Sequence, residues 1–314
     1  MRYFIRRLLF FLLPLVLYIS VAFFVDPFSI IHSESNSRIA AVKAEIASRL
    51  NYPLFKLQRF TKNPSEIILL GDSRTDKLSV LVFENLTKQR VTNLAYGGGT
   101  IPEIVTTFWY SIQNHNIKEV YIGLNFNMYN KGINMNRVPE AIRLKNSPLS
   151  YIFSKYCFKS IYRIITSFLT DEQIDIEKPN LNKSEFWQYQ LESTITNFYK
   201  YYQYPDSFAS SLSEISKYCH KNNIKLTFII PPTHTDLQNK IIEYELEEQE
   251  LRFKQDISEL GILYDYDFPN TLTTNRENFS DPFHFKDSIA NIIVRELVTK
   301  KFRYARTNNL VKRK

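Results

Sequence analysis

Short apolar segments alternate with helical segments over most of the chain, and this alternation restricts the possible folds more than any other feature. The apolar segments are rich in β-branched and aromatic residues and lie at 66–70, 90–94, 118–125, 225–230 and 262–266. Helical patterns occupy 101–115, 207–222 and 239–259. Almost wholly apolar strands separated by helices are typical of a parallel sheet covered on both faces. The sequence therefore predicts an α/β domain at residues 65–300.

An uncharged segment near the N-terminus predicts a membrane anchor. Residues 8–25, LLFFLLPLVLYISVAFFV, are long enough to span a bilayer, which takes roughly 17 to 25 apolar residues. No polar stripe interrupts them, as one would in a core helix. A cleaved signal peptide ends in a small-residue site, whereas this segment runs through Phe24 and Val25 into Asp26. We therefore expect an uncleaved transmembrane helix.

The basic residues gather at the two ends of the chain. Residues 1–7 carry three arginines and residues 300–314 carry seven lysines and arginines; without these ten, the formal net charge of +8 becomes −2. A body close to neutral argues against a nucleic-acid groove. The positive-inside rule predicts cytoplasmic residues 1–7, with the remainder of the chain outside, in the periplasm or at the cell surface. The basic tail, 301–314, is either solvated or in contact with anionic lipid headgroups.

Two further segments depart from the alternating pattern. Residues 26–64 are expected to form a helical stalk, because apolar residues from Ile39 to Leu50 recur at helical spacing. Residues 128–206 form an insertion unusually rich in tyrosine and phenylalanine. Helical spacing at 151–168 predicts a small helical lobe packed on the edge of the sheet, and stacking of sugar rings or acyl chains in a cleft is the alternative. Both interpretations of the insertion stay open.

Polar residues follow the predicted strands. The first strand runs into Gly71-Asp72-Ser73, which places a hydroxyl at a strand-to-helix turn. Gly71 permits a tight turn there, and the backbone N–H groups at the start of a helix stabilise negative charge. No glycine follows two residues after Ser73, so the G-x-S-x-G nucleophile elbow of α/β-hydrolases is absent.

The next two strands end in groups that suit an oxyanion. The glycines 97–99 precede a helix, so a backbone N–H at this point can approach a ligand, although a plain loop explains them equally well. The third strand ends in Gly123-Leu124-Asn125-Phe126-Asn127, where a side-chain amide can supply another donor. Late in the chain comes Asp281-Pro282-Phe283-His284.

These blocks, in this order, resemble the SGNH (GDSL-like) hydrolase superfamily. The first, Gly71-Asp72-Ser73, resembles the block with the nucleophilic serine, and the last resembles the Asp-x-x-His block. The resemblance implies a flavodoxin-like three-layer sandwich with Ser73 as nucleophile and with Asp281 and His284 completing the catalytic triad. Asn93 to Gly98 and Gly123 to Asn125 resemble the two middle blocks, which implies an oxyanion hole that contains Gly98 and Asn125.

The sequence departs from the family pattern at two positions. Phe126 stands where the family usually has aspartate, which makes Asn127 a rival oxyanion donor, and Arg74 replaces an apolar residue after the serine. The variant looks more like the membrane-anchored, glycan-modifying branches than the soluble lipases.

The histidines have structural alternatives. Asp281 followed by proline also suits a helix N-cap, with His284 as a surface residue of the first turn. His234 follows the fourth strand and could border the cleft, whereas His32, His115 and His220 are expected at the surface or at helix ends. Two cysteines, Cys157 and Cys219, are too few for a metal site, and their pairing stays open.

Three functions are consistent with these features. The first is acyl-ester chemistry at a cell-envelope glycan, as an esterase or O-acyltransferase with an acyl-serine intermediate, no cofactor or metal, and a membrane-bound acyl-transfer partner as one option. The second is a lipase or thioesterase acting on membrane-derived acyl chains. The third is a catalytically silent glycan-binding or assembly component.

Overall fold

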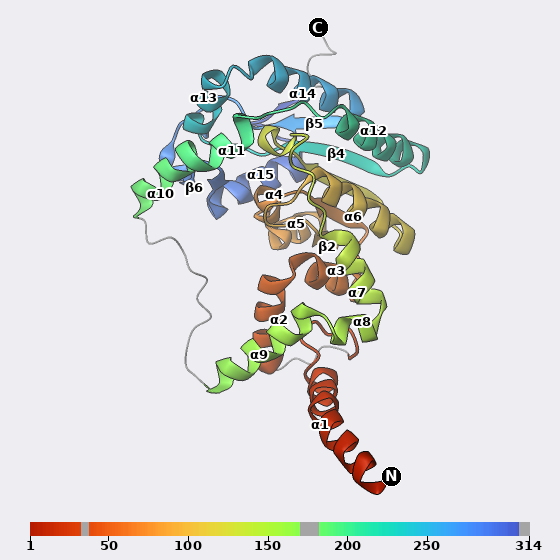
Figure 1. The fold of residues 1–314 in the computed structure, drawn as a ribbon. Coiled ribbons are helices and arrows are strands. Elements are labelled where there is room, and N and C mark those ends of the chain that lie inside the picture. The colour runs from red at the N-terminus through yellow and green to blue at the C-terminus, as the bar shows by residue number, and fades with distance from the viewer. Residues whose placement is uncertain (33–37, 170–181, 308–314) are drawn as a thin grey trace. The chain divides into compact units, whose positions relative to one another are not determined.

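The computed structural model describes residues 1–32, 38–169 and 182–307 (Figure 1). The chain divides into two compact units. The first comprises Met1–Asn63 with Arg137–Lys178, and the second comprises Pro64–Asn136 with Pro179–Lys314. Parts of the predicted stalk (33–37), insertion (170–181) and basic tail (308–314) lie outside the described residues.

A mostly parallel sheet forms the centre of the second unit. Its strands are β1 (Ile67–Leu70), β2 (Val91–Asn93), β3 (Glu119–Gly123), β4 (Lys225–Ile230), β5 (Ile262–Asp265) and β8 (Arg306–Thr307). Their order is β2-β1-β3-β4-β5-β8, with only β8 antiparallel to its neighbour. The register places Ile68 of β1 between Thr92 and Val120. The first five strands confirm the predicted α/β fold, and their order is that of flavodoxin-like folds.

The strand order decides which helices cover which face. Along the sheet, the chain steps from β1 to β2 in one direction and from β2 through β3, β4 and β5 in the opposite direction. Because βαβ crossovers are right-handed, helices that follow opposite steps lie on opposite faces of the sheet. Helix α5 (Val80–Thr87) therefore covers one face, where α15 (Asp287–Thr299) packs beside it. On the other face, α12 (Asp206–Lys221) packs between α6 (Ile101–Asn114) and α14 (Glu247–Leu260) (Figure 1). This reversal of strand order opens a crevice at the carboxyl ends of β1 and β3.

The described residues of the first unit form helices and their connections, with no strand among them. It contains α1 (Arg2–Val25), α2 (Arg38–Leu50), α3 (Tyr52–Lys62), α7 (Val138–Asn146), α8 (Pro148–Ile152) and α9 (Lys155–Leu169). Helix α2 packs on α9, and α3 packs on α7. The helices of the predicted stalk thus pack with the first part of the predicted insertion. The rest of the insertion, from α10 (Lys183–Tyr189) to α11 (Ile195–Tyr199), belongs to the second unit.

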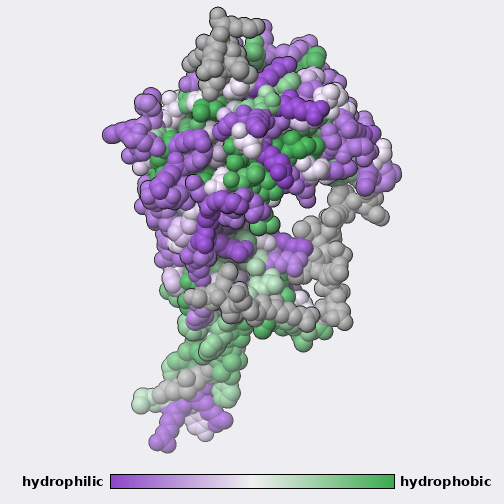
Figure 2. All heavy atoms as spheres, turned by 180° about the vertical axis from the view of Figure 1, so that it is seen from behind, coloured by the Kyte–Doolittle hydropathy of each residue, from purple (hydrophilic) through white to green (hydrophobic). Residues whose placement is uncertain are grey.

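Helix α1 is long and apolar enough to cross a membrane and is mostly exposed (green in Figure 2). It ends where Asp26 adopts a left-handed conformation, with φ of 37°. The Asp26 carboxylate accepts hydrogen bonds from the backbone N–H groups of Ile30, Ile31 and His32. This buried carboxylate therefore fixes the turn that follows the apolar helix.

The cysteines lie in different units, Cys157 in α9 and Cys219 in α12. Both are buried free thiols. Burial raises the pKa of Cys157 to about 11 and that of Cys219 to about 12. Because the thiolate is the reactive form, neither side chain is suited to nucleophilic chemistry.

Candidate active site

Ser73 is the first residue of α4 (Ser73–Asp76), directly after β1 and its two-residue turn. The turn is held by close packing around Thr75. A Cβ atom added to Gly71, which has φ of 157°, would meet the Thr75 hydroxyl at 2.3 Å. One added to Gly123, at the end of β3, would meet the same hydroxyl at 1.8 Å. The two glycines therefore allow β1, β3 and the serine turn to come together.

Ser73, His284 and Asp281 form a continuous chain of hydrogen bonds. The Oγ of Ser73 lies 2.8 Å from Nε2 of His284, and Nδ1 of His284 lies 2.9 Å and 3.0 Å from the two Asp281 oxygens. A carboxylate accepts only, so Nδ1 must carry the proton and Nε2 is left to accept from the serine. This tautomer suits His284 to the role of general base.

The residues between Asp281 and His284 make a tight hairpin of β6 (Phe279–Asp281) and β7 (His284–Phe285). Asp281 accepts from the backbone N–H groups of Phe283 and His284. Helix α15 begins only at Asp287, after Lys286. The alternative in which Asp281 caps a helix is therefore wrong, because its carboxylate holds the hairpin and the imidazole instead.

Arg74 joins a buried polar cluster behind the serine. Its guanidinium pairs with the Asp72 carboxylate at 2.8 Å and also donates to the side-chain oxygens of Asn125 and Asn127. Burial raises the pKa of Asp72, but the Arg74 charge and hydrogen bonds from Arg74 and Asn125 outweigh it, so the pKa lies below its usual value. Nη1 of Arg74 has no hydrogen-bond partner among the described residues.

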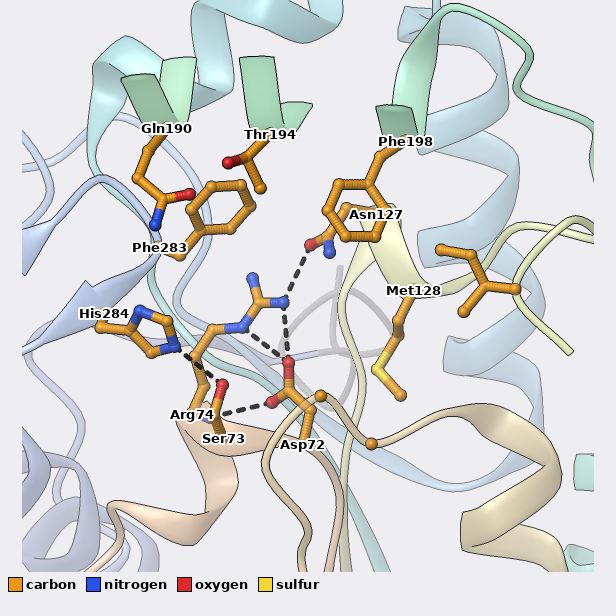
Figure 3. A pocket seen from close by; sticks show the side chains of 13 residues that line it. Asp72, Ser73, Arg74, Asn127, Met128, Gln190, Thr194, Phe198, Phe283 and His284 are labelled. Carbon is orange, nitrogen blue, oxygen red and sulfur yellow. Dashed lines mark hydrogen bonds and ion pairs between the residues drawn. The ribbon is translucent and has the colours of Figure 1, made fainter. Parts of the chain in front are cut away.

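The structure places the two candidate amides differently. The amide nitrogen of Asn125 donates to Asp72 at 3.1 Å, and this residue is almost completely buried in the cluster. Asn127, in the 3₁₀ turn Phe126–Met128, lines the pocket (Figure 3). Its oxygen accepts from Arg74 at 2.9 Å, which turns its NH₂ group away from the guanidinium. Of the two, Asn127 is the amide presented to a ligand.

The glycine loop lies against the serine turn. Asn93 donates to the backbone oxygens of Thr75 and Asp76 at 2.9 Å and 3.2 Å, which ties the start of the loop to α4. Gly98, with φ of 61°, and Gly99 line the pocket beside Ser73. The structure thus brings the predicted Gly98 to the triad.

A pocket of about 360 Å³ opens above these residues. Figure 3 shows Arg74 and Ser73 on its floor and Gln190, Thr194 and Phe198 above them. Gln190 and Thr194 belong to a π-helical turn, Gln190–Thr194, which continues into α11. The pocket is apolar along Met128, Ile133, Phe198 and Phe283 and polar at Arg74, Gln190 and Thr194.

The sequence did not predict the polar groups above the serine. Gln190 and Thr194 carry no motif and lie in a segment dominated by aromatic residues. Of those aromatic residues, Phe198 lines the pocket, whereas Trp187 and Tyr199 are buried in the second unit. Irregular π turns occur often at functional sites, but they leave no clear pattern in a sequence.

His234 does not line the pocket. Its side chain is buried, and Nδ1 caps α13 (Thr235–Glu243) by accepting from the backbone N–H of Asp236. The backbone N–H of His234 donates to the backbone oxygen of Pro282. The residue therefore supports the hairpin of Asp281 and His284 from behind. Among the described residues, no group of three or more His, Cys, Asp or Glu is arranged to hold a metal ion.

Comparisons with known proteins give matches to solved structures only. No family model and no curated protein matches the sequence. Solved structures do match the backbone of the chain over most of its length. A catalytic mutant of an acetylxylan esterase from Geobacillus stearothermophilus is 12% identical, with 77% of this chain and 97% of that chain covered and a TM-score of 0.39.

A GDSL-like lipase from Bacteroides thetaiotaomicron is 10% identical, with 83% of this chain and 99% of that chain covered and a TM-score of 0.37. Similarity at this level carries no argument about activity. Any function must therefore be inferred from the geometry of the chain itself.

Proposed function

We propose that the chain is a membrane-anchored, extracytoplasmic serine esterase or O-acyltransferase of the SGNH type that acts on acyl esters of cell-envelope glycans. The observation that carries this proposal is the hydrogen-bonded series Ser73, His284 and Asp281, which ends at the wall of a pocket. An activated hydroxyl in a partly apolar pocket suits attack on an ester carbonyl.

The chemistry follows from the positions of the protons. As Ser73 Oγ attacks the acyl carbon, its proton passes to Nε2 of His284, and Asp281 stabilises the resulting imidazolium. The tetrahedral intermediate collapses when the bond to the alcohol oxygen breaks and His284 returns the proton to that oxygen. The acyl-serine then transfers its acyl group to water or to a second hydroxyl, with His284 removing the proton from the acceptor.

The negative oxygen of the intermediate requires donors. Those offered by the pocket are the backbone N–H groups of Ser73 and Gly98 and the amide NH₂ of Asn127. Asn125 holds Asp72 and Arg74 in place behind them. This assignment gives the oxyanion role expected for Asn125 to its rival Asn127, because Arg74 and Asp72 hold Asn125 in the buried cluster.

A glycan ester fits the polar part of the pocket. The unpaired Nη1 of Arg74 is a donor, while the buried Oε1 of Gln190 is an acceptor without a partner among the described residues. A sugar hydroxyl can accept and donate at the same time. The Arg74 charge is already balanced by Asp72, so the pocket suits neutral hydroxyls better than a carboxylate.

A lipase or thioesterase is the second candidate. The lining by Met128, Ile133, Phe198 and Phe283 favours it, since these side chains can bury an acyl chain. Chain-length preference distinguishes the two functions. We expect a higher kcat/KM for acetylated sugars than for octanoyl esters, whereas the reverse preference would favour the lipase.

Covalent labelling tests the proposed nucleophile. Full-length protein in detergent is treated with a fluorophosphonate probe, and wild type is compared with Ser73→Ala and His284→Ala. We expect labelling of the wild type and its loss in both variants. Ser48→Ala, a change in α2 at a serine that bonds to the Glu45 oxygen, serves as the control and should label normally. A folded wild type without labelling would contradict the esterase and favour a silent glycan-binding component.

A further inference from the structure

Helix α9 carries an exposed apolar stripe. Phe158, Tyr162, Ile165 and Leu169 follow one another at intervals of four, three and four residues, which places them on one side of a helix. Their exposed fractions are 60%, 64%, 45% and 78%. Isolated apolar residues are common on protein surfaces, but a continuous aromatic and aliphatic stripe indicates a contact surface.

The stripe is distinct from the packed face of the same helix. Cys157, Ser160, Ile161 and Ile164 are buried, and α9 packs on α2. At 100° per residue, the centre of the stripe lies roughly 120° around the helix from this buried face. The stripe is therefore not part of the core of the first unit.

A basic row borders the stripe on its other side. Lys155, Lys159 and Arg163 follow at intervals of four residues, and α9 contains no acidic residue. An apolar stripe flanked by lysine and arginine is typical of helices that lie in a membrane interface, where the long basic side chains reach the phosphate groups.

The stripe adjoins the apolar helix of the same unit. The Tyr18 ring of α1 lies 6.0 Å from the Phe158 ring and 6.5 Å from the Phe153 ring, and its hydroxyl donates to the Ile152 oxygen. Tyr18 lies seven residues before the end of α1 at Val25. At a rise of about 1.5 Å per residue, this is about 10 Å from that end of the helix, a depth that an interfacial helix reaches.

We infer that α9 lies beside α1 in the membrane–water interface on the extracytoplasmic side of the bilayer. Its apolar stripe then contacts lipid, and its basic row contacts anionic headgroups. The inference rests on the proposed anchoring by α1. It gives the first unit a second attachment to lipid. One helix alone would permit rotation about its axis, and α9 removes this freedom because it contacts the bilayer at a second point.

Lipid contact can be measured in full-length protein reconstituted in vesicles of phosphatidylcholine and phosphatidylglycerol. Tryptophan replaces Tyr162 or Ile165 in the stripe, Lys159 in the basic row, or Phe11 in α1. Brominated lipids quench the fluorescence of nearby indoles. The fluorescence of the wild type, which comes from Trp109 and Trp187, is subtracted as background. We expect Y162W and I165W to lose at least half of their added fluorescence, F11W to lose more, and K159W to lose clearly less.

The outcomes separate the inference from the anchoring on which it rests. Quenching of F11W without quenching of Y162W and I165W would leave the anchor intact and overturn the role of α9. Cross-linking between stripes of two copies in that case would assign the stripe to self-association instead. No quenching of F11W would overturn both the anchor and the inference. Equal quenching of K159W and Y162W would contradict the proposed orientation.

Discussion

Arg74 changes the site more than any other residue that departs from the family pattern. Arginine needs acceptors when buried, and this one is only 2% exposed. Asp72 and the oxygens of Asn125 and Asn127 supply them. Both amide groups are thereby oriented by one guanidinium. Neither spacing nor residue type shows which amide faces the pocket.

Substitution of the two asparagines tests this assignment. We expect Asn127→Ala to lower kcat by about 100-fold or more, because loss of one oxyanion donor has this magnitude, and to lower the unfolding free energy by about 1–3 kcal/mol, because buried Arg74 loses an acceptor. Asn125→Ala removes a hydrogen bond to a buried carboxylate, so its main effect should be a loss of about 1.5–3 kcal/mol in unfolding free energy. Steady-state kinetics with an acetyl ester and denaturant unfolding measure the two effects. The opposite pattern would restore Asn125 as the donor.

Among the elements, the junction of β3 with α4 is the most tightly constrained. Gly123→Ala would place a Cβ atom 1.8 Å from the Thr75 hydroxyl, where the strand backbone cannot move away. We expect a loss of about 1–3 kcal/mol in stability, the usual result of overpacking, together with reduced activity. Gly97→Ala is the matched control, because its Cβ would meet no atom within 4 Å. Similar melting temperatures for the two variants would show that β3 does not confine the serine turn.

His234 links α13 to the hairpin of Asp281 and His284, and its lowered pKa predicts a pH dependence of stability. Burial lowers its pKa, as does the Arg276 charge, while Asp236 opposes the shift. The unfolded chain therefore binds a proton at about pH 6.5, the ordinary histidine value, whereas the folded chain binds one only at lower pH. The stability contributed by neutral His234 is therefore fully present above about pH 6.5, and it is lost as the pH falls toward the pKa of the folded state.

Asparagine retains an N-cap acceptor without titrating. We expect His234→Asn to lose less unfolding free energy than wild type between pH 7 and pH 5, as measured by denaturant titrations at each pH. His220, which caps no helix and is exposed, offers the control substitution His220→Asn. Parallel pH profiles of wild type and H234N would contradict a neutral, buried imidazole.

At the scale of the molecule, the sequence predicted the parts governed by local patterns. The apolar strands predicted the sheet, and the resemblance to SGNH hydrolases predicted Ser73, Gly98, Asp281 and His284, which the structure brings together. It did not predict that α2 and α3 pack with α7 and α9, because helical periodicity identifies an apolar face but not its partner. Similarly, β8 is only two residues long, too short to leave a strand pattern in the predicted basic tail.

Whether α1 is retained or cleaved decides whether the whole molecule is attached to a membrane. A helix of 24 residues near the N-terminus serves either as an anchor or as a removable signal, and the absence of a small-residue cleavage site favours the anchor. We expect the full-length protein to remain with membranes at high salt and to dissolve only in detergent, with an intact mass that includes residues 1–25. A soluble product beginning after residue 25 would contradict this.

The orientation of the anchor can be tested with alkaline phosphatase, which is active only outside the cytoplasm. We expect it to be active when fused to residue 314. Removal of Arg2, Arg6 and Arg7 should lower this activity, because it removes the positive charge that keeps the N-terminus in the cytoplasm.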